Sequence, residues 1–95
     1  MAEGYQNKIN GFEVEHIGTQ KIFDYTMAST TPVGCHFIYA QYSPDNPFTG
    51  NVSYAIVNKI RDDGGYSQAI LWGSAKLYVS QIYGPSSGSI TWYEK

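Results

Sequence analysis

The chain has 95 residues, a formal net charge of −2 and only 15% charged residues. This length predicts a single domain with a small core. The six Lys and Arg are scattered along the sequence, so there is no basic stripe and nucleic acid is excluded as an expected partner. Ten Gly, four Pro and nine Tyr favour strands and turns over long helices.

The first ten residues are polar and show no hydrophobic periodicity, so residues 1–10 are expected to form a flexible N-terminal segment. They lack the basic start and the apolar run of a signal peptide. No stretch of the sequence approaches the length of a membrane span, so no membrane insertion is predicted. Regular alternation begins near Gly11, and residues 11–95 are expected to form a single β-domain.

The first predicted strand covers residues 12–17, FEVEHI, in which Phe12, Val14 and His16 alternate with two glutamates. Residues 20–27, QKIFDYTM, fit either one turn of helix or an extended segment. The β-forming residues in this segment favour the extended form.

A clearer strand candidate covers residues 35–42, CHFIYAQY, between two segments that contain Pro and Gly. The second of these segments, residues 43–50, predicts a loop because Asn46 precedes a proline and because Ser, Asp and Gly supply turn chemistry. Residues 51–60, NVSYAIVNKI, alternate again and predict the next strand.

Two hairpins are predicted in the second half of the chain. Residues 61–66, RDDGGY, carry an acidic-Gly turn signal whose glycines can adopt positive φ. The strand candidates at residues 66–72 and 76–83 are joined by a link of hairpin length at residues 73–75. The last strand candidate is ITWYE at residues 90–94.

These segments amount to six or seven short strands, with turn signals at intervals of about ten residues. No segment of comparable length to an ordinary helix has a convincing helical period. The sequence therefore predicts an all-β fold, specifically a small antiparallel β-sandwich or barrel.

The single cysteine gives little support for nucleophilic catalysis. Cys35 is adjacent to His36, and on a strand their side chains point to opposite faces, so they cannot form a nucleophile and its base. His16 could approach Cys35 from another strand, but Cys35 is expected to be a small structural residue of the core. One cysteine also excludes an intramolecular disulfide.

The carboxylates do not suggest a catalytic pair or a metal site. Glu13 and Glu15 share one face of one strand, and Asp62 and Asp63 belong to a turn, so no two acids are expected to face each other across a cleft. Neither zinc-ligand spacing nor the alternating acids of a calcium loop is present. The sequence predicts that the protein is not an enzyme and that it has no metal and no cofactor.

The aromatic content exceeds what a small core needs, with nine Tyr, four Phe and two Trp. Tyrosine combines a flat apolar ring with a polar hydroxyl, which suits it to interfaces. Some of the tyrosines are therefore expected at a subunit contact or on a ligand-facing surface. Six aromatic residues are expected to build the core and its rim: Phe37, Tyr39, Tyr54, Trp72, Tyr78 and Trp92.

Six segments between about residue 30 and residue 95 follow a recognisable order: TTPVGCHFIYA, SPDNP, NVSYAIVNKI, YSQAILW, KLYVSQIY and SITWYEK. They comprise a Pro- and Gly-containing strand entry, an Asn-Pro loop, a long strand, a Gln-containing strand, an aromatic strand and a terminal Trp motif. This order resembles the pyocin-knob-like domains at the tips of bacteriophage tail fibres and related virion fibres.

The resemblance implies a non-enzymatic virion component, a fibre-tip or receptor-binding knob that recognises a cell-surface glycan. It also implies manufacture in the host bacterial cytoplasm, contact with other virion proteins and assembly as a homotrimer, which the small size and the excess of aromatic residues also favour. Aromatic rings can stack on the apolar face of a sugar while amides bond its hydroxyl groups. The candidate ligand contacts are Asn46, Asn51, Trp72, Gln81, Tyr83 and Trp92.

Two alternatives stay open. The first is a capsid-decorating or assembly protein without a ligand, in which the aromatic residues serve subunit contacts. The second is a small intracellular inhibitor or regulator from a mobile element, and the low charge argues against one that mimics nucleic acid.

Overall fold

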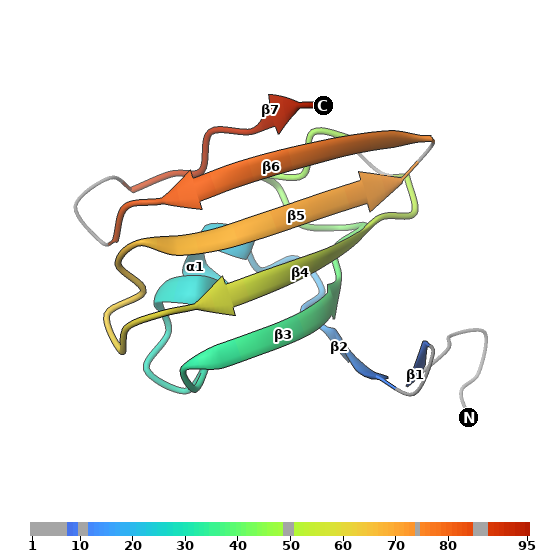
Figure 1. Cartoon of the computed structure of the whole chain (residues 1–95). Helices are drawn as coiled ribbons and strands as arrows, with labels where there is room; N and C mark the ends of the chain where they lie inside the picture. Colours follow the sequence, from blue (N-terminus) through green and yellow to red (C-terminus); the bar gives the residue numbers. More distant parts are fainter. Residues whose placement is uncertain (1–7, 10–11, 49–50, 74, 85–87) are drawn as a thin grey trace.

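The computed structural model describes residues 8–9, 12–48, 51–73, 75–84 and 88–95. The strands form one sheet in the order β1-β2-β3-β4-β5-β6-β7, and one short helix lies against one of its faces (Figure 1). The elements are β1 (Lys8–Ile9), β2 (Phe12–His16), α1 (Ile22–Met27), β3 (Gly34–Tyr39), β4 (Tyr54–Lys59), β5 (Ser67–Gly73), β6 (Lys76–Ile82) and β7 (Tyr93–Glu94).

The strands β2 and β3 are parallel, with Val14 opposite Phe37, while every other neighbouring pair is antiparallel. Parallel strands cannot be joined by a tight turn, and here the chain crosses over through α1. The prediction of a wholly antiparallel, all-β architecture is therefore wrong at this point. The extended form favoured for residues 20–27 is also wrong, since most of this segment forms the helix.

The helix begins where a distant loop satisfies its first backbone amides. Asp45 accepts hydrogen bonds from the amides of Ile22 and Phe23, with N···O distances of 2.8 and 3.0 Å. The local sequence supplies no side-chain cap at Lys21. The indole Nε1 of Trp92 donates to the Asp45 carbonyl at 2.9 Å. Helix, loop and C-terminal segment are thus joined at one residue.

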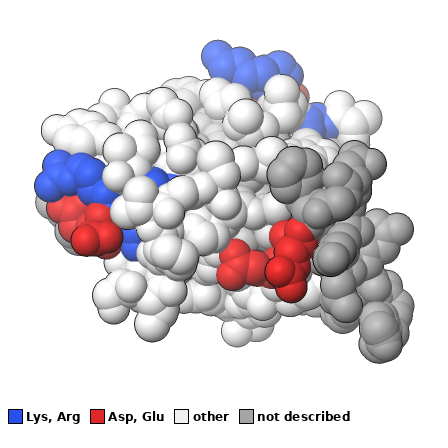
Figure 2. All heavy atoms as spheres, turned by 60° about the horizontal axis from the view of Figure 1, so that its bottom comes forward, with Lys and Arg blue, Asp and Glu red and all other residues white. Residues whose placement is uncertain are grey.

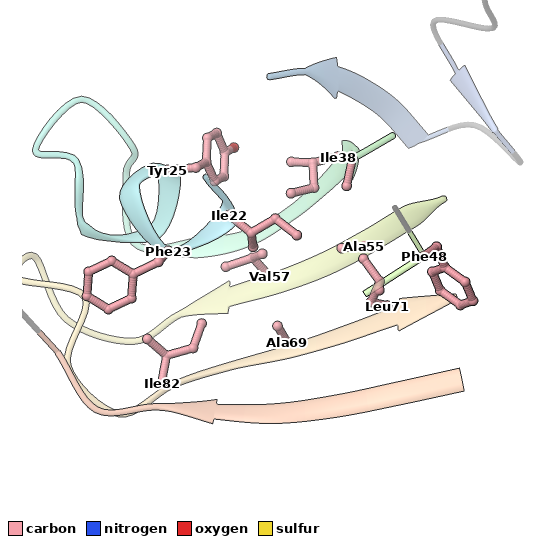
Figure 3. Packing of buried hydrophobic residues seen from close by; sticks show 11 residues of the cluster. Ile22, Phe23, Tyr25, Ile38, Phe48, Ala55, Val57, Ala69, Leu71 and Ile82 are labelled. Carbon is pink, nitrogen blue, oxygen red and sulfur yellow. The ribbon is translucent and has the colours of Figure 1, made fainter. Parts of the chain in front are cut away.

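The core lies between α1 and one face of the sheet (Figure 3). Side chains of α1 pack on those of the central strands, and Phe48 from the loop after β3 covers the other end of this face, with its ring 5.3 Å from that of Tyr78. The buried cluster consists of Ile22, Phe23, Tyr25, Ile38, Ala40, Phe48, Ala55, Val57, Ala69, Leu71 and Ile82.

The last residue of β4 is a lysine that is buried on the core side of the sheet, near the end of α1. Lys59 is 1% exposed, and its Nζ donates to the carbonyls of Ala28 and Thr31 at 2.6 and 2.7 Å. Ala28 immediately follows α1, and its carbonyl also accepts a hydrogen bond from Thr31 N at 3.0 Å, so the ammonium group bonds to the turn in which the helix ends. This contact fixes α1 and the following loop to the sheet.

The prediction of a small, mostly β fold is confirmed, and so are both hairpins. The chain turns at residues 62–65 between β4 and β5, where Gly64 has a φ of +77°, and again between Gly73 and Lys76. The predicted sandwich or barrel is not what the described strands form, because they make a single layer without a closing strand pair. Of the predicted N-terminal segment, residues 1–10, only Lys8–Ile9 are described, as β1.

Candidate functional site

The face of the sheet opposite α1, here called the outer face, carries large side chains that the core does not use. Strand registers place these residues in rows, because residues opposite each other in neighbouring strands share a face. The outer face consists of Cys35, Phe37, Tyr39, Tyr54, Ile56, Asn58, Gln68, Ile70, Trp72, Leu77, Val79 and Gln81, with Tyr93 of β7 beside Val79.

Aromatic rings gather at one end of this face. The rings of Tyr54 and Trp72 are stacked, with centroids 6.1 Å apart and planes inclined by 30°. Phe37 approaches Trp72 at 5.5 Å, Tyr39 approaches Tyr54 at 5.4 Å, and His16 approaches Tyr39 at 5.2 Å. These contacts hold each ring in a defined orientation while Trp72 stays partly accessible. The cluster is a fixed, partly exposed aromatic platform, in which Tyr54 and Trp72 are stacked and the other rings are tilted or edge-on.

Amide side chains form another row, four residues from the row of Tyr54 and Trp72 along each strand. Asn58, Gln68 and Gln81 lie opposite one another on β4, β5 and β6. Gln81 Nε2 donates to the Ser67 carbonyl at 3.3 Å, and Asn58 Oδ1 accepts from Cys35 Sγ at 3.7 Å. The Gln68 side chain is exposed and makes no hydrogen bond within the described part of the chain. The row therefore offers amide donors and acceptors to a ligand.

Between the platform and the amides the surface is apolar and hollowed. A cavity of about 420 Å³ opens over β4, β5 and β6. Exposed side chains of Ile56 and Ile70 form its floor together with Val79, and Tyr93 stands at its side. Ile70 is 43% exposed, although its neighbours Ala69 and Leu71 are fully buried on the other face. Apolar side chains thus cover both faces of the central strands.

The outer face has no Asp, Glu, Lys or Arg among its residues. In the view of Figure 2, acidic and basic side chains form small separate groups with uncharged surface between them. Arg61 and Asp63 form an exposed ion pair at 2.9 Å in the turn before β5, and Lys76 lies 3.9 Å from Glu94. The outer face thus offers no carboxylate, ammonium or guanidinium group to an occupant.

Two of the predicted contacts, Asn46 and Trp92, lie on the core side. Asn46 is 3% exposed, and its Nδ2 donates to Ala40 O at 2.8 Å and Ser53 Oγ at 2.6 Å, while Oδ1 accepts from Phe48 N at 2.8 Å. The hydrogen bonds of this amide thus hold the loop between β3 and β4 in its conformation. Trp92 packs against the core cluster. Both positions argue for structural roles.

The other four predicted contacts are spread over the surface. Trp72 and Gln81 lie on the outer face, in different rows. Tyr83 follows β6 and is 63% exposed, and Asn51 is exposed with its Nδ2 bonded to Phe48 O at 2.9 Å. The structure therefore does not bring the six predicted residues into one site.

Of the outer face, sequence reasoning chose only Trp72 and Gln81 as ligand contacts, and Tyr54, Asn58 and Gln68 are among the members that it missed. The signal that could have found them is the composition of residues 54–57, YAIV, which is apolar at odd and even positions alike. Such a strand is apolar on both faces, so only one face can belong to the core of a single-sheet protein.

The prediction that Cys35 is a core residue is wrong, because Cys35 is exposed on the outer face. His36 points to the opposite side, as the alternation predicts, where its ring lies 5.8 Å from that of Tyr25. Its Nε2 donates to the Pro32 carbonyl at 2.7 Å, and Nδ1 lies 3.1 Å from Glu15 Oε1. Cys35 and His36 are therefore not placed to act together.

The Tyr25 hydroxyl donates to Glu15, which links α1 to β2. Burial raises the pKa of Tyr25 well above its ordinary value, and the hydrogen bond to Glu15 and the charge of that carboxylate raise it further. A polar hollow of about 290 Å³ lies beside this contact. In the described ranges, no three His, Cys, Asp or Glu side chains gather as the ligands of a metal ion would.

No protein-family model, curated protein or solved structure matches this chain. The resemblance to pyocin-knob-like domains stays a prediction that these comparisons do not test. None of the described helical residues belongs to a helix long and apolar enough to cross a membrane.

Proposed function

We propose that this protein is a non-enzymatic virion component, a fibre-tip or receptor-binding domain that recognises a cell-surface glycan through its outer face. The observation that carries the proposal is the stacked pair of Tyr54 and Trp72 at the end of an uncharged sheet face, on which an apolar row separates the pair from a row of amides. The attribution to a virion rests on the resemblance of the sequence segments to fibre-tip domains.

The chemistry of this face suits a neutral sugar. The C–H face of a pyranose ring is apolar and packs on an aromatic ring, while its hydroxyl groups need donors and acceptors such as the amides of Asn58 and Gln68. Phosphate-bearing ligands would need cations, which the outer face lacks. An apolar ligand would leave the amide row without partners, which is costly once water is excluded.

A second copy of the chain is the competing occupant, as in a capsid-decorating or assembly protein without a ligand. Four strands about 4.8 Å apart, each contributing about six residues at about 3.3 Å, give a footprint of roughly 400 Å². Two such faces would bury about 800 Å² in total, which is below the roughly 1,200 Å² at which specific, stable interfaces begin. A sandwich formed between copies is therefore the less favoured proposal.

Binding to an array of bacterial surface glycans tests the proposed function. Trp72→Ala should abolish or strongly weaken the binding that the unmodified protein shows. Tyr42→Ala is the matched control, because Tyr42 is 54% exposed but lies in the loop after β3, outside the sheet. Equal loss in both variants, or binding that survives in Trp72→Ala, would refute the assignment to this face.

Assembly as a homotrimer stays part of the proposal. If the outer face holds a glycan, copies must associate through other surfaces, since a face covered by a second chain cannot bind a ligand. Sedimentation equilibrium should give a trimer mass, and Trp72→Ala should leave that mass unchanged. A monomer that persists at high concentration would refute the trimer, and an oligomer that Trp72→Ala dissociates would favour the assembly protein.

A further inference from the structure

The outer face of β5 and β6 continues beyond the amide row to a second aromatic contact. The register pairs Trp72 with Leu77 at one end and Gln68 with Gln81 towards the other. One residue beyond the pair of Ser67 and Ile82, the rings of Tyr66 and Tyr83 meet, with centroids 6.2 Å apart and planes at 79°. One continuous track therefore has aromatic rings at both ends, with apolar surface and amides between them.

Tyr66 is held in an unusual backbone conformation. Its φ is +58°, a region that bulky residues rarely occupy, yet its side chain is 57% exposed and makes little use of the core. The Arg61 guanidinium lies 5.8 Å from the centre of the Tyr66 ring, on the turn that precedes it. An exposed aromatic residue at a strained backbone position points to a role in binding.

The length of the track limits what can occupy it. Six residues separate Tyr66 from Trp72, so the two aromatic ends lie about 20 Å apart at the rise of a β-strand. This distance is several times the width of one sugar ring. A single terminal sugar could contact only one end.

The hydrogen bonding of β5 leaves no free backbone edge to which a peptide strand could add. Peptides that add to a sheet bond to the free backbone edge of a strand. Here β5 is paired on both sides, with β4 and β6, and β6 is paired with β5 along its length and with β7 at Tyr78 and Val79. A ligand lying over β5 must bond to side chains, and those between the two aromatic ends are apolar or amide.

We infer that the track takes an extended, neutral oligosaccharide that contacts Trp72 at one end and the Tyr66–Tyr83 pair at the other, with Gln68 and Gln81 bonding the sugars between them. This inference rests on the proposed function and specifies its ligand as a linear chain of several sugars. Affinity should therefore grow with chain length until both aromatic ends are engaged.

Titration calorimetry with neutral linear oligosaccharides of one series, from a single sugar to a hexasaccharide, tests this inference. The series is a chito- or malto-oligosaccharide or the neutral repeat found on the glycan array. Tyr83→Ala should weaken hexasaccharide binding roughly tenfold, the loss expected for one aromatic contact, and leave disaccharide binding unchanged. Tyr66→Gly should do the same, and glycine relieves the positive φ, so its unfolding midpoint separates a binding role from a structural one.

The outcomes distinguish this inference from the function on which it rests. Disaccharide binding that depends on Trp72 but does not strengthen with chain length would overturn the extended track and leave glycan recognition intact. Absence of binding to every sugar on the array and in the series would overturn both. Tyr66→Gly that unfolds the protein, with Tyr83→Ala binding normally, would show that the tyrosine pair is structural and would also overturn the inference.

Discussion

Replacing Lys59 by methionine isolates the contribution of the ammonium group buried beneath the sheet. Its Nζ donates to the carbonyls of Ala28 and Thr31, and the residue is 1% exposed. Methionine has nearly the same length and volume, so this substitution removes two hydrogen bonds without opening a large cavity.

The size of the effect depends on how well each carbonyl finds a new partner. The bond to Thr31 is buried, so its loss leaves an unsatisfied acceptor and costs about 1–3 kcal/mol, whereas the bond to Ala28 is partly buried and water can replace much of it. Removing a buried charge relieves a desolvation cost that acts in the opposite direction. We expect a net loss of about 2 kcal/mol in the free energy of unfolding, or about 10 °C in Tm for a domain of this size.

Guanidinium denaturation followed by circular dichroism measures this loss. Lys76→Met is the matched control, because the Lys76 side chain is 54% exposed and lies 3.9 Å from an equally exposed Glu94. The control should stay within about 0.5 kcal/mol of the unmodified protein. A Lys59→Met variant as stable as the control, or more stable than the unmodified protein, would show that desolvation outweighs the two hydrogen bonds and would refute the reasoning.

Other polar contacts of the folded chain lead to separate expected outcomes. Asp45→Asn keeps an acceptor near α1 but removes its charge, and should lower the free energy of unfolding by about 1 kcal/mol in the same denaturation assay. Asn46→Ala, which frees several buried partners, should cost about 2–3 kcal/mol, and an unaltered midpoint would contradict the structural role. Because the pKa of Tyr25 is raised in the folded state, its contribution to stability is complete below about pH 10 and is lost as the pH rises further. Phenolate absorbance during alkaline titration should show one tyrosine that ionises only on unfolding, and Tyr25→Phe should remove that step.

The parts of the fold that the sequence predicts are those set by neighbouring residues. The turns at residues 62–65 and 73–75 depend on local chemistry, and so does the opposite orientation of Cys35 and His36. The helix depends on Asp45, more than twenty positions away, so no local signal for its start exists. The positions of Asn46 and Cys35 also escaped prediction, since alternation shows which residues share a face but not which face the core covers.

The distribution of side-chain sizes across the central strands explains why large aromatic side chains lie on the outer face and not in the core. On the core side, β4 and β5 present small or medium residues such as Ala55 and Ala69, because α1 and the loop carrying Phe48 pack closely on them. The bulky residues of the same strands, Tyr54 and Trp72, alternate to the outer face. Burying them by register shift would bring Ala55 and Ala69 outward and place large rings where α1 now packs, so the sheet cannot slip without losing its core. The aromatic platform is thus fixed by the packing on the opposite face, and its partial exposure is a consequence of the fold that a ligand or partner can use.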